Sequence, residues 1–330
     1  FEILAILVLV AVITFLVRRN IIKLKRFIHN DLKGWPKSDA NYILYFEIVL
    51  MALFLLMNAA DFTLQQRGAP HFIQAGSFPV SQFVAPVFNS ISIETLLILE
   101  RVFWWMHIAG ILIFMNYLYF SKHLHILLAF PNTYFADLNP LGKFDNLESV
   151  TKEVKLMMDP NADPFAAPAA DADAAPAKFG ASDVQDLNWV QLLNAYTCTE
   201  CGRCTSSCPA NITGKKLSPR KIMMDTRDRL EEVGKNIDAN KGVFVADNKT
   251  LLNDYITPEE LWACTSCNAC VEECPVNISP LSIIMDMRRY LVMEQSAAPM
   301  SLNAMMTNVE NNGAPWQYSQ QDRLNWKNEN

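Results

Sequence analysis

Long apolar runs separated by short polar connections make up the first 130 residues of the chain. The runs cover residues 1–17, 42–60 and 91–120, and each contains few charged side chains. A helix needs about 20 apolar residues to cross the ~30 Å hydrocarbon core of a bilayer. The pattern therefore predicts a transmembrane anchor of three helices in residues 1–130. Because the chain opens inside an apolar run without Met, we expect upstream residues or a processed terminus.

The charges beside these runs predict how the anchor is oriented. The segment between the first two runs is basic, with Arg18, Arg19, Lys23, Lys25, Arg26, Lys33 and Lys37. The next connection, 61–90, has Arg67 as its basic residue and holds a candidate interfacial piece at 78–88. Basic connections favour the cytoplasmic side of a membrane. The third run therefore runs inward to Lys122, and everything after it is predicted to lie in the cytoplasm.

Beyond residue 130 the chain becomes polar, and its composition predicts three further parts. Residues 131–185 read as a linker whose Ala-, Pro- and Asp-rich stretch, 159–183, is typical of an extended or flexible tether. Such a tether would let the following domain, 186–295, dock away from its own anchor. The polar remainder, 296–330, is predicted to be a tail that orders against a partner.

All eight cysteines fall in two identical motifs. Residues 198–209 read Cys-x2-Cys-x2-Cys-x3-Cys-Pro, and residues 264–275 repeat that spacing. In this pattern three thiolates hold one cubane, and the fourth, followed by proline, ligates the other cluster. The motifs predict two [4Fe–4S] clusters. The predicted ligands are Cys198, Cys201, Cys204 and Cys274 for the first cluster, and Cys264, Cys267, Cys270 and Cys208 for the second.

Two other uses of cysteine fit the spacing less well. A structural zinc site uses paired Cys-x2-Cys knuckles with four ligands per metal, and it does not need a third x2 step or a trailing Cys-Pro. A disulfide scaffold belongs to short secreted domains. Thiolate clusters also belong on the reducing side of a membrane, which agrees with the orientation that the charges predict.

Similarity between the two halves extends past the cysteines. Cys208-Pro-Ala-Asn-Ile-Thr is echoed by Cys274-Pro-Val-Asn-Ile-Ser, and residues 222–230 are echoed by residues 283–291. Pro219 and Pro280 precede these segments and suit the first turn of a helix. Each half is predicted to be a cluster loop followed by a helix, so the fold class is mainly α: a helical anchor followed by an α-helical ferredoxin. Basic residues beside the first motif are candidates for tuning its potential or docking an acidic partner, although most surface cations do neither: Arg203, Lys215, Lys216 and Arg220.

Two histidines of the third apolar run are candidate ligands for haem b. His107 and His125 lie about five helical turns apart, so a continuous helix would place both on one face, roughly 27 Å apart. One histidine supplies one axial position, and residues 42–60 contain no histidine. The other axial ligands would have to come from His29 or His71, from upstream residues or from another subunit.

Glu100 and Arg101 are adjacent charged residues near the outer end of the third run. A carboxylate at membrane depth is a candidate proton acceptor from a quinol. The competing interpretation is an ion pair at the membrane interface. The net charge of −6, without a basic domain face, argues against a nucleic-acid partner.

The chain resembles fused respiratory iron–sulfur proteins related to heterodisulfide reductase and to electron-transfer-flavoprotein:menaquinone oxidoreductases. The resemblance rests on Trp104-Trp-Met-His107, on residues 121–135, on Thr199-Glu-Cys-Gly-Arg-Cys-Thr and on residues 285–291. It implies an anchor similar to the cytochrome b subunit of nitrate reductase, with two haems b, and menaquinone as the quinone. This sequence departs from the family because the second run lacks histidine and no CCG-type cysteine-rich domain follows. We therefore expect a separate CCG-type or flavoprotein subunit.

Together these features predict a membrane-bound electron-transfer subunit of a quinone-linked oxidoreductase complex. It would lie in the bacterial cytoplasmic membrane, with the clusters on the cytoplasmic side. The alternative is an anchor or electron-wire subunit without haem or a quinone site of its own. The chain shows no acid–base or nucleophile constellation, so we expect it to turn over no organic substrate by itself.

Overall fold

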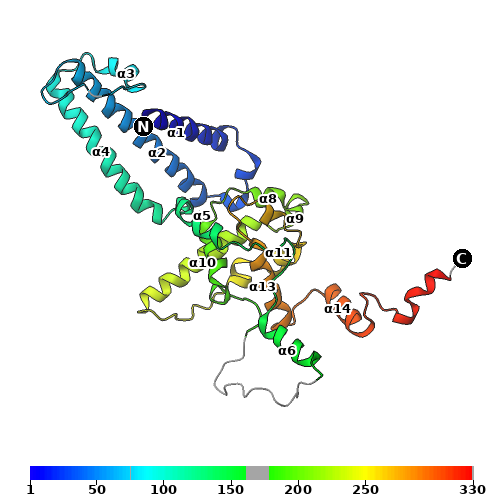
Figure 1. The fold of residues 1–330 in the computed structure, drawn as a ribbon. Helices are drawn as coiled ribbons and strands as arrows, with labels where there is room; N and C mark the ends of the chain where they lie inside the picture. Colours follow the sequence, from blue (N-terminus) through cyan, green and yellow to red (C-terminus); the bar gives the residue numbers. More distant parts are fainter. Residues whose placement is uncertain (75, 161–177, 329–330) are drawn as a thin grey trace.

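The computed structural model describes residues 1–74, 76–160 and 178–328 and is built from helices throughout these ranges. Figure 1 shows long N-terminal helices extending away from a compact helical body, with the C-terminal segment projecting from its other side. The mainly α fold class is therefore confirmed. Most of the predicted tether lies outside the described residues.

The anchor consists of three helices, α1 (Glu2–Leu16), α2 (Trp35–Gln66) and α4 (Ile93–Tyr119). By length and composition, α2 and α4 could cross a membrane. The helix α1 is shorter, and a π-helical turn, η1 (Val17–Ile21), continues it. Large apolar side chains are exposed along α1 and α4, among them Leu7, Ile98, Trp105 and Leu112. This distribution suits helices whose outer faces meet lipid rather than a protein core.

Short helical pieces close the far end of the anchor. They are α3 (Ser81–Val84) and η4 (Ala85–Phe88), within the predicted interfacial segment. The buried carboxylate of Glu2 accepts hydrogen bonds from the backbone N–H of Val80, at 2.8 Å, and of Ser81, at 3.1 Å. Asn58 of α2 donates a third bond at 3.1 Å. One carboxylate therefore ties α1 to α2 and to this connection.

Immediately beyond the third span, the structure differs from the sequence prediction of one helix that continues to His125. The helix α4 ends at Tyr119, a short 3-10 turn η5 (Lys122–Leu124) follows, and α5 (His125–Tyr134) is a separate helix (Figure 1). Ser121 breaks the run with extended backbone, and its side chain accepts a hydrogen bond from the N–H of His123. His107 and His125 therefore do not lie on one continuous helix, and the prediction that they share a face was wrong.

The cysteine domain (residues 186–295) contains the helical repeat that the sequence predicts. Each half ends in a longer helix, α10 (Pro219–Ala239) or α13 (Pro280–Met293), and each helix begins at its proline. The shorter elements are η6 (Val184–Asp186), α7 (Trp189–Thr197), α8 (Arg203–Ser207), α9 (Pro209–Ile212), η7 (Leu251–Tyr255), α11 (Pro258–Ala263) and α12 (Ala269–Glu272). Fully buried Ile222 and Ile283 occupy equivalent places in one shared core.

The cysteine domain packs directly against one end of its own anchor. Phe135 meets Trp189 edge-on, with ring centroids 4.7 Å apart, and the side chain of Asn132 donates a hydrogen bond of 2.7 Å to the Val276 carbonyl. The tether was predicted to allow docking away from the anchor, and in this structure the domain contacts its own anchor. Asn132 of α5 and Phe135, which follows that helix, supply these contacts.

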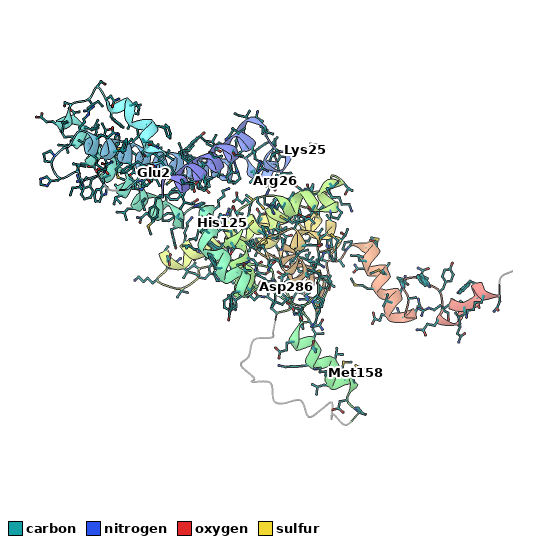
Figure 2. All side chains as sticks on the ribbon, turned by 45° about the horizontal axis from the view of Figure 1, so that its top comes forward. Glu2, Lys25, Arg26, His125, Met158 and Asp286 are labelled. Carbon is teal, nitrogen blue, oxygen red and sulfur yellow. The ribbon has the colours of Figure 1, made fainter. Side chains whose placement is uncertain are left out.

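Two further helices lie outside this core. The predicted linker contains α6 (Glu148–Met158), whose Met157 and Met158 side chains are exposed (Figure 2). The C-terminal segment forms α14 (Met300–Asn312) and a 3-10 stretch, η8 (Gln320–Lys327), and it extends away from the domain in Figure 1. Binding of a partner to this tail stays a prediction.

Candidate metal centres

Each cysteine motif folds into a loop of the same backbone shape. In the first motif Glu200 and Gly202 have positive φ, at 58° and 75°, and in the second Ser266 and Asn268 have 54° and 60°. Left-handed backbone at these positions curls the loop so that successive cysteines turn inward. The helices α7 and α11 end immediately before Cys198 and Cys264, so each loop begins directly after a helix.

The first predicted ligand set lines one cavity. Three of its members come from the first loop and Cys274 comes from the second motif, and together they border a cavity of about 160 Å³. Cys270 also reaches its wall. The three-plus-one arrangement is what a cubane bound by two interleaved motifs requires. The side chains present therefore fit a [4Fe–4S] cluster.

The second predicted set also comes together. The thiols of Cys264 and Cys270 lie close enough to Cys208 and Cys267 for their charges to interact. Cys270 is buried, whereas Cys267 is exposed to solvent. Cys204 and Cys270 interact in the same way across the two sets, so the two centres are neighbours.

Burial governs the acidity of these thiols. Burial, with a smaller contribution from neighbouring cysteines, raises the pKa of Cys198, Cys204 and Cys270 to about 12 in each case. All eight cysteines are free thiols. Thiolate ligation in such surroundings requires compensating positive charge, which iron supplies on binding with release of the thiol protons.

Across the described residues, His, Cys, Asp and Glu side chains form no group of three or more that could hold a single metal ion. The cysteines of the first predicted set surround a cavity.

A buried arginine forms part of the first cavity wall. Arg220, at the start of α10, is 1 % exposed and lines the cavity beside Gly202. Its Nη2 donates to Asp31 at 3.0 Å, and its Nη1 donates to the carbonyl of Arg26 at 2.8 Å. Both partners belong to the basic connection between the first two spans. This connection, labelled at Arg26 in Figure 2, therefore reaches the wall of the cluster cavity.

A second buried ion network joins the first loop to the membrane exit. Glu200, between two cysteine ligands, is buried and pairs with Lys122, which follows α4. Arg227 of α10 holds the same carboxylate at 2.9 Å. Lys122 also donates to the Pro36 carbonyl at 2.6 Å, at the start of α2. No sequence pattern predicted that these residues would meet, because they are separated by long stretches of chain.

The structure separates the two predicted haem ligands. His107 lies within α4 and bonds the Leu50 carbonyl of α2 at 3.0 Å through Nδ1. His125 lines the cysteine cavity, and its Nδ1 lies 2.9 Å from the Lys122 carbonyl (Figure 2). A carbonyl only accepts, so Nδ1 carries the proton in this bond. His125 therefore belongs to the cluster surroundings rather than to a site shared with His107.

Glu100 and Arg101 lie together on α4, at the far end of the anchor. Arg101 Nε is 3.1 Å from Glu100 Oε2, and the Glu100 side chain is buried. Arg101 also borders a shallow apolar groove whose other lining residues are Leu97, Ile98, Val102, Trp105 and Met106. The predicted ion pair is present, and the groove beside it is a place where an apolar molecule could lie.

Comparison with known proteins supports the cysteine assignment. Residues 197–278 match the family model for the 4Fe-4S dicluster domain. The chain is 30% identical to the probable iron-sulfur-binding oxidoreductase FadF of Bacillus subtilis, over 99% of this chain and 46% of that protein. It is 29% identical to the EtfAB:quinone oxidoreductase of Syntrophomonas wolfei, over 91% of this chain and 41% of that protein.

A shorter match adds an anchored ferredoxin to these relatives. The chain is 35% identical to a probable membrane-anchored ferredoxin of Chromohalobacter salexigens, over 48% of this chain and 25% of that protein. The chain spans just under half the length of the first two relatives. No solved structure matches it significantly.

Proposed function

We propose that this chain, an iron–sulfur protein homologous to FadF-type oxidoreductases and containing a 4Fe-4S dicluster domain, passes electrons between a soluble redox partner and the membrane quinone pool. The observation that carries the proposal is the meeting of Cys274 with Cys198, Cys201 and Cys204 around one cavity. A shared cluster would explain why cysteines of two distant motifs converge there.

In this proposal the ligand sets are those that the spacing predicts. Cys198, Cys201, Cys204 and Cys274 would hold the first [4Fe–4S] cluster, and Cys264, Cys267, Cys270 and Cys208 would hold the second. Such clusters, when bound, supply one-electron transfer, while the protein supplies ligation, burial and nearby charge. Because Cys204 and Cys270 are neighbours, electrons would pass between the two centres over a short distance.

The positions of the two centres suggest a direction through the molecule. The second centre has the exposed Cys267 at its edge, where a soluble partner can approach. The first centre lies against the membrane exit, because His125 lines it and Asp31 holds its arginine. The soluble partner, a flavoprotein or a CCG-type subunit, would therefore meet the second centre, and the membrane side would meet the first.

The proposal also includes electron exchange with a membrane quinone. One relative is named as an EtfAB:quinone oxidoreductase, and the groove beside Arg101 offers an apolar surface next to a buried carboxylate, Glu100. By family resemblance the quinone would be menaquinone. The chain would be a multi-pass protein of the bacterial cytoplasmic membrane with its clusters on the cytoplasmic side. Haem b at His107 and His125 stays a prediction, although the break after Tyr119 removes the shared helix that placed both on one face.

Anaerobic purification of the chain tests this proposal. We expect about eight iron and eight sulfide per chain, and two interacting [4Fe–4S] signals in electron paramagnetic resonance of the dithionite-reduced protein. Cys274→Ser should alter the first centre, and Cys208→Ser should alter the second. Stoichiometric zinc without iron would refute the ligand proposal. If menaquinol analogues do not reduce the clusters, and the reduced clusters do not reduce menaquinone, the chain is instead an electron-wire or scaffold subunit.

A further inference from the structure

The internal repeat allows the surroundings of the two centres to be compared position by position. The helices α10 and α13 both begin at a proline that follows a capping serine, Ser218 or Ser279. Each serine accepts a hydrogen bond from the N–H three residues later, at 3.3 Å in both helices. The two helix starts are therefore structurally equivalent, and any chemical difference between them is a difference between the two centres.

At one position of the repeat, the first half has a charged side chain and the second half has an apolar one. The residue after the proline is Arg220 in the first half and Leu281 in the second. Both are buried, at 1 % and 3 % exposure. Arg220 lines the cavity of the first ligand set, so its guanidinium acts on that centre through a water-excluded space.

The remaining charges of the two loops do not cancel this difference. Arg227 at the first centre has Arg288 as its equivalent, so each half has one cation there. Glu200 replaces Ser266, but Lys122 and Arg227 both pair with its carboxylate. Arg203, whose equivalent is Ala269, also lines the first cavity. The first centre therefore has more positive surroundings than the second.

The anchor holds the distinguishing charge in place. Asp31, 6 % exposed, accepts from Arg220, and Ser218 donates a further hydrogen bond of 2.7 Å to the same oxygen. Asp31 does not line the cavity, so the cation of this pair is nearer to the cysteines than the anion. Gly202 makes this placement possible, because a Cβ there would lie 2.5 Å from Arg220 Nη1.

We propose that Arg220, held by Asp31 of the anchor, raises the reduction potential of the first centre above that of the second. An electron that enters at the second centre then moves to the first, which lies on the membrane side. The step is a one-electron transfer in which the second cluster is oxidised and the first is reduced, with a soluble low-potential reductant refilling the second. A guanidinium favours the reduced cluster because reduction adds negative charge. This inference rests on the proposed ligand sets.

Redox titration followed by electron paramagnetic resonance tests it on the full chain in detergent. Arg220→Met should lower the midpoint potential of the first centre and leave that of the second in place. We expect the electron distribution between the centres to change on the order of tenfold, equivalent to about 59 mV for a one-electron couple. Arg220→Lys keeps the charge and should retain most of the wild-type separation.

Asp31→Asn provides the decisive control, because it keeps Arg220 and removes its counter-charge. The potential of the first centre should then rise, opposite to the effect of Arg220→Met, whereas loss of packing would move both variants in one direction. Lys216→Met removes an exposed cation paired with Glu259 and should move neither potential. Equal shifts of both centres, or shifts of one sign in both variants, would overturn the inference. Wild-type protein without iron would instead defeat the proposed function itself.

Discussion

Arg220 Nη2 and Asp31 Oδ2 lie 3.0 Å apart, although 189 residues separate them in the chain. One belongs to the helix that follows the first cysteine motif, and the other to the connection between the first two spans. Both side chains are buried. This ion pair joins the anchor to the cysteine domain, and its arginine lines the cavity of the first predicted ligand set.

Breaking this pair on the anchor side should weaken docking. Asp31→Ala leaves the Arg220 guanidinium buried without its anion. Removing one partner of a buried ion pair lowers the free energy of unfolding by about 3–5 kcal/mol. We expect a matching fall in thermal stability, measured by loss of the cluster absorbance on heating. The double variant Asp31→Leu with Arg220→Met removes both charges and should lose less thermal stability than Asp31→Ala alone. If the double variant is the less stable of the two, the pair does not contribute as described.

The contact between Lys122 and Glu200 should behave in the same way. Lys122→Met removes one of two cations from a buried carboxylate, so we expect the domain to be destabilised by roughly 3 kcal/mol. Lys216→Met is the matched control, because its partner Glu259 is exposed and the pair is screened by solvent. Thermal unfolding of both variants measures the difference. Equal midpoints would show that the buried network adds nothing to docking.

Gly202 should not tolerate a side chain. It has φ of 75°, and an added Cβ would lie 2.5 Å from Arg220 Nη1 and 3.0 Å from the Arg26 carbonyl. Gly202→Ala combines a left-handed backbone cost of roughly 1–2 kcal/mol with this clash. Gly214→Ala is the control, since Gly214 has φ of 83° but open space around it. We expect a lower iron content and lower stability for Gly202→Ala, and the backbone cost alone for Gly214→Ala.

Acid stability should depend on a buried arginine at the other side of the domain. Arg229 is fully buried, and its hydrogen bonds lower the pKa of Asp247 to about 2. A carboxyl whose folded pKa is depressed stabilises the fold above its ordinary pKa of 3.8, and this contribution is lost as the pH falls toward 2. The stability difference between wild type and Asp247→Asn, measured by urea unfolding, should therefore shrink from pH 5 to pH 2. A constant difference would contradict this assignment.

The sequence predicted the parts of the fold that local pattern controls. Apolar runs long enough for a bilayer gave α2 and α4, and the prolines at 219 and 280 marked the starts of both repeat helices. The prediction that His107 and His125 share one helical face was wrong because it assumed one helix through Ser121, where the side chain and extended backbone end the run instead. Helical periodicity places two residues on one face only when both belong to the same continuous helix.

By itself, the sequence determined the class of site: eight cysteines at fixed spacing predict two cubane clusters, and residues 197–278 match a 4Fe-4S dicluster domain. The tertiary structure alone decided where that chemistry sits. It brought Asp31 and Lys122 of the anchor to Arg220 and Glu200 of the first motif, and it left Cys267 of the second exposed. The reason is physical: ligand spacing is a property of a short loop, whereas buried charges find partners only when distant segments pack together.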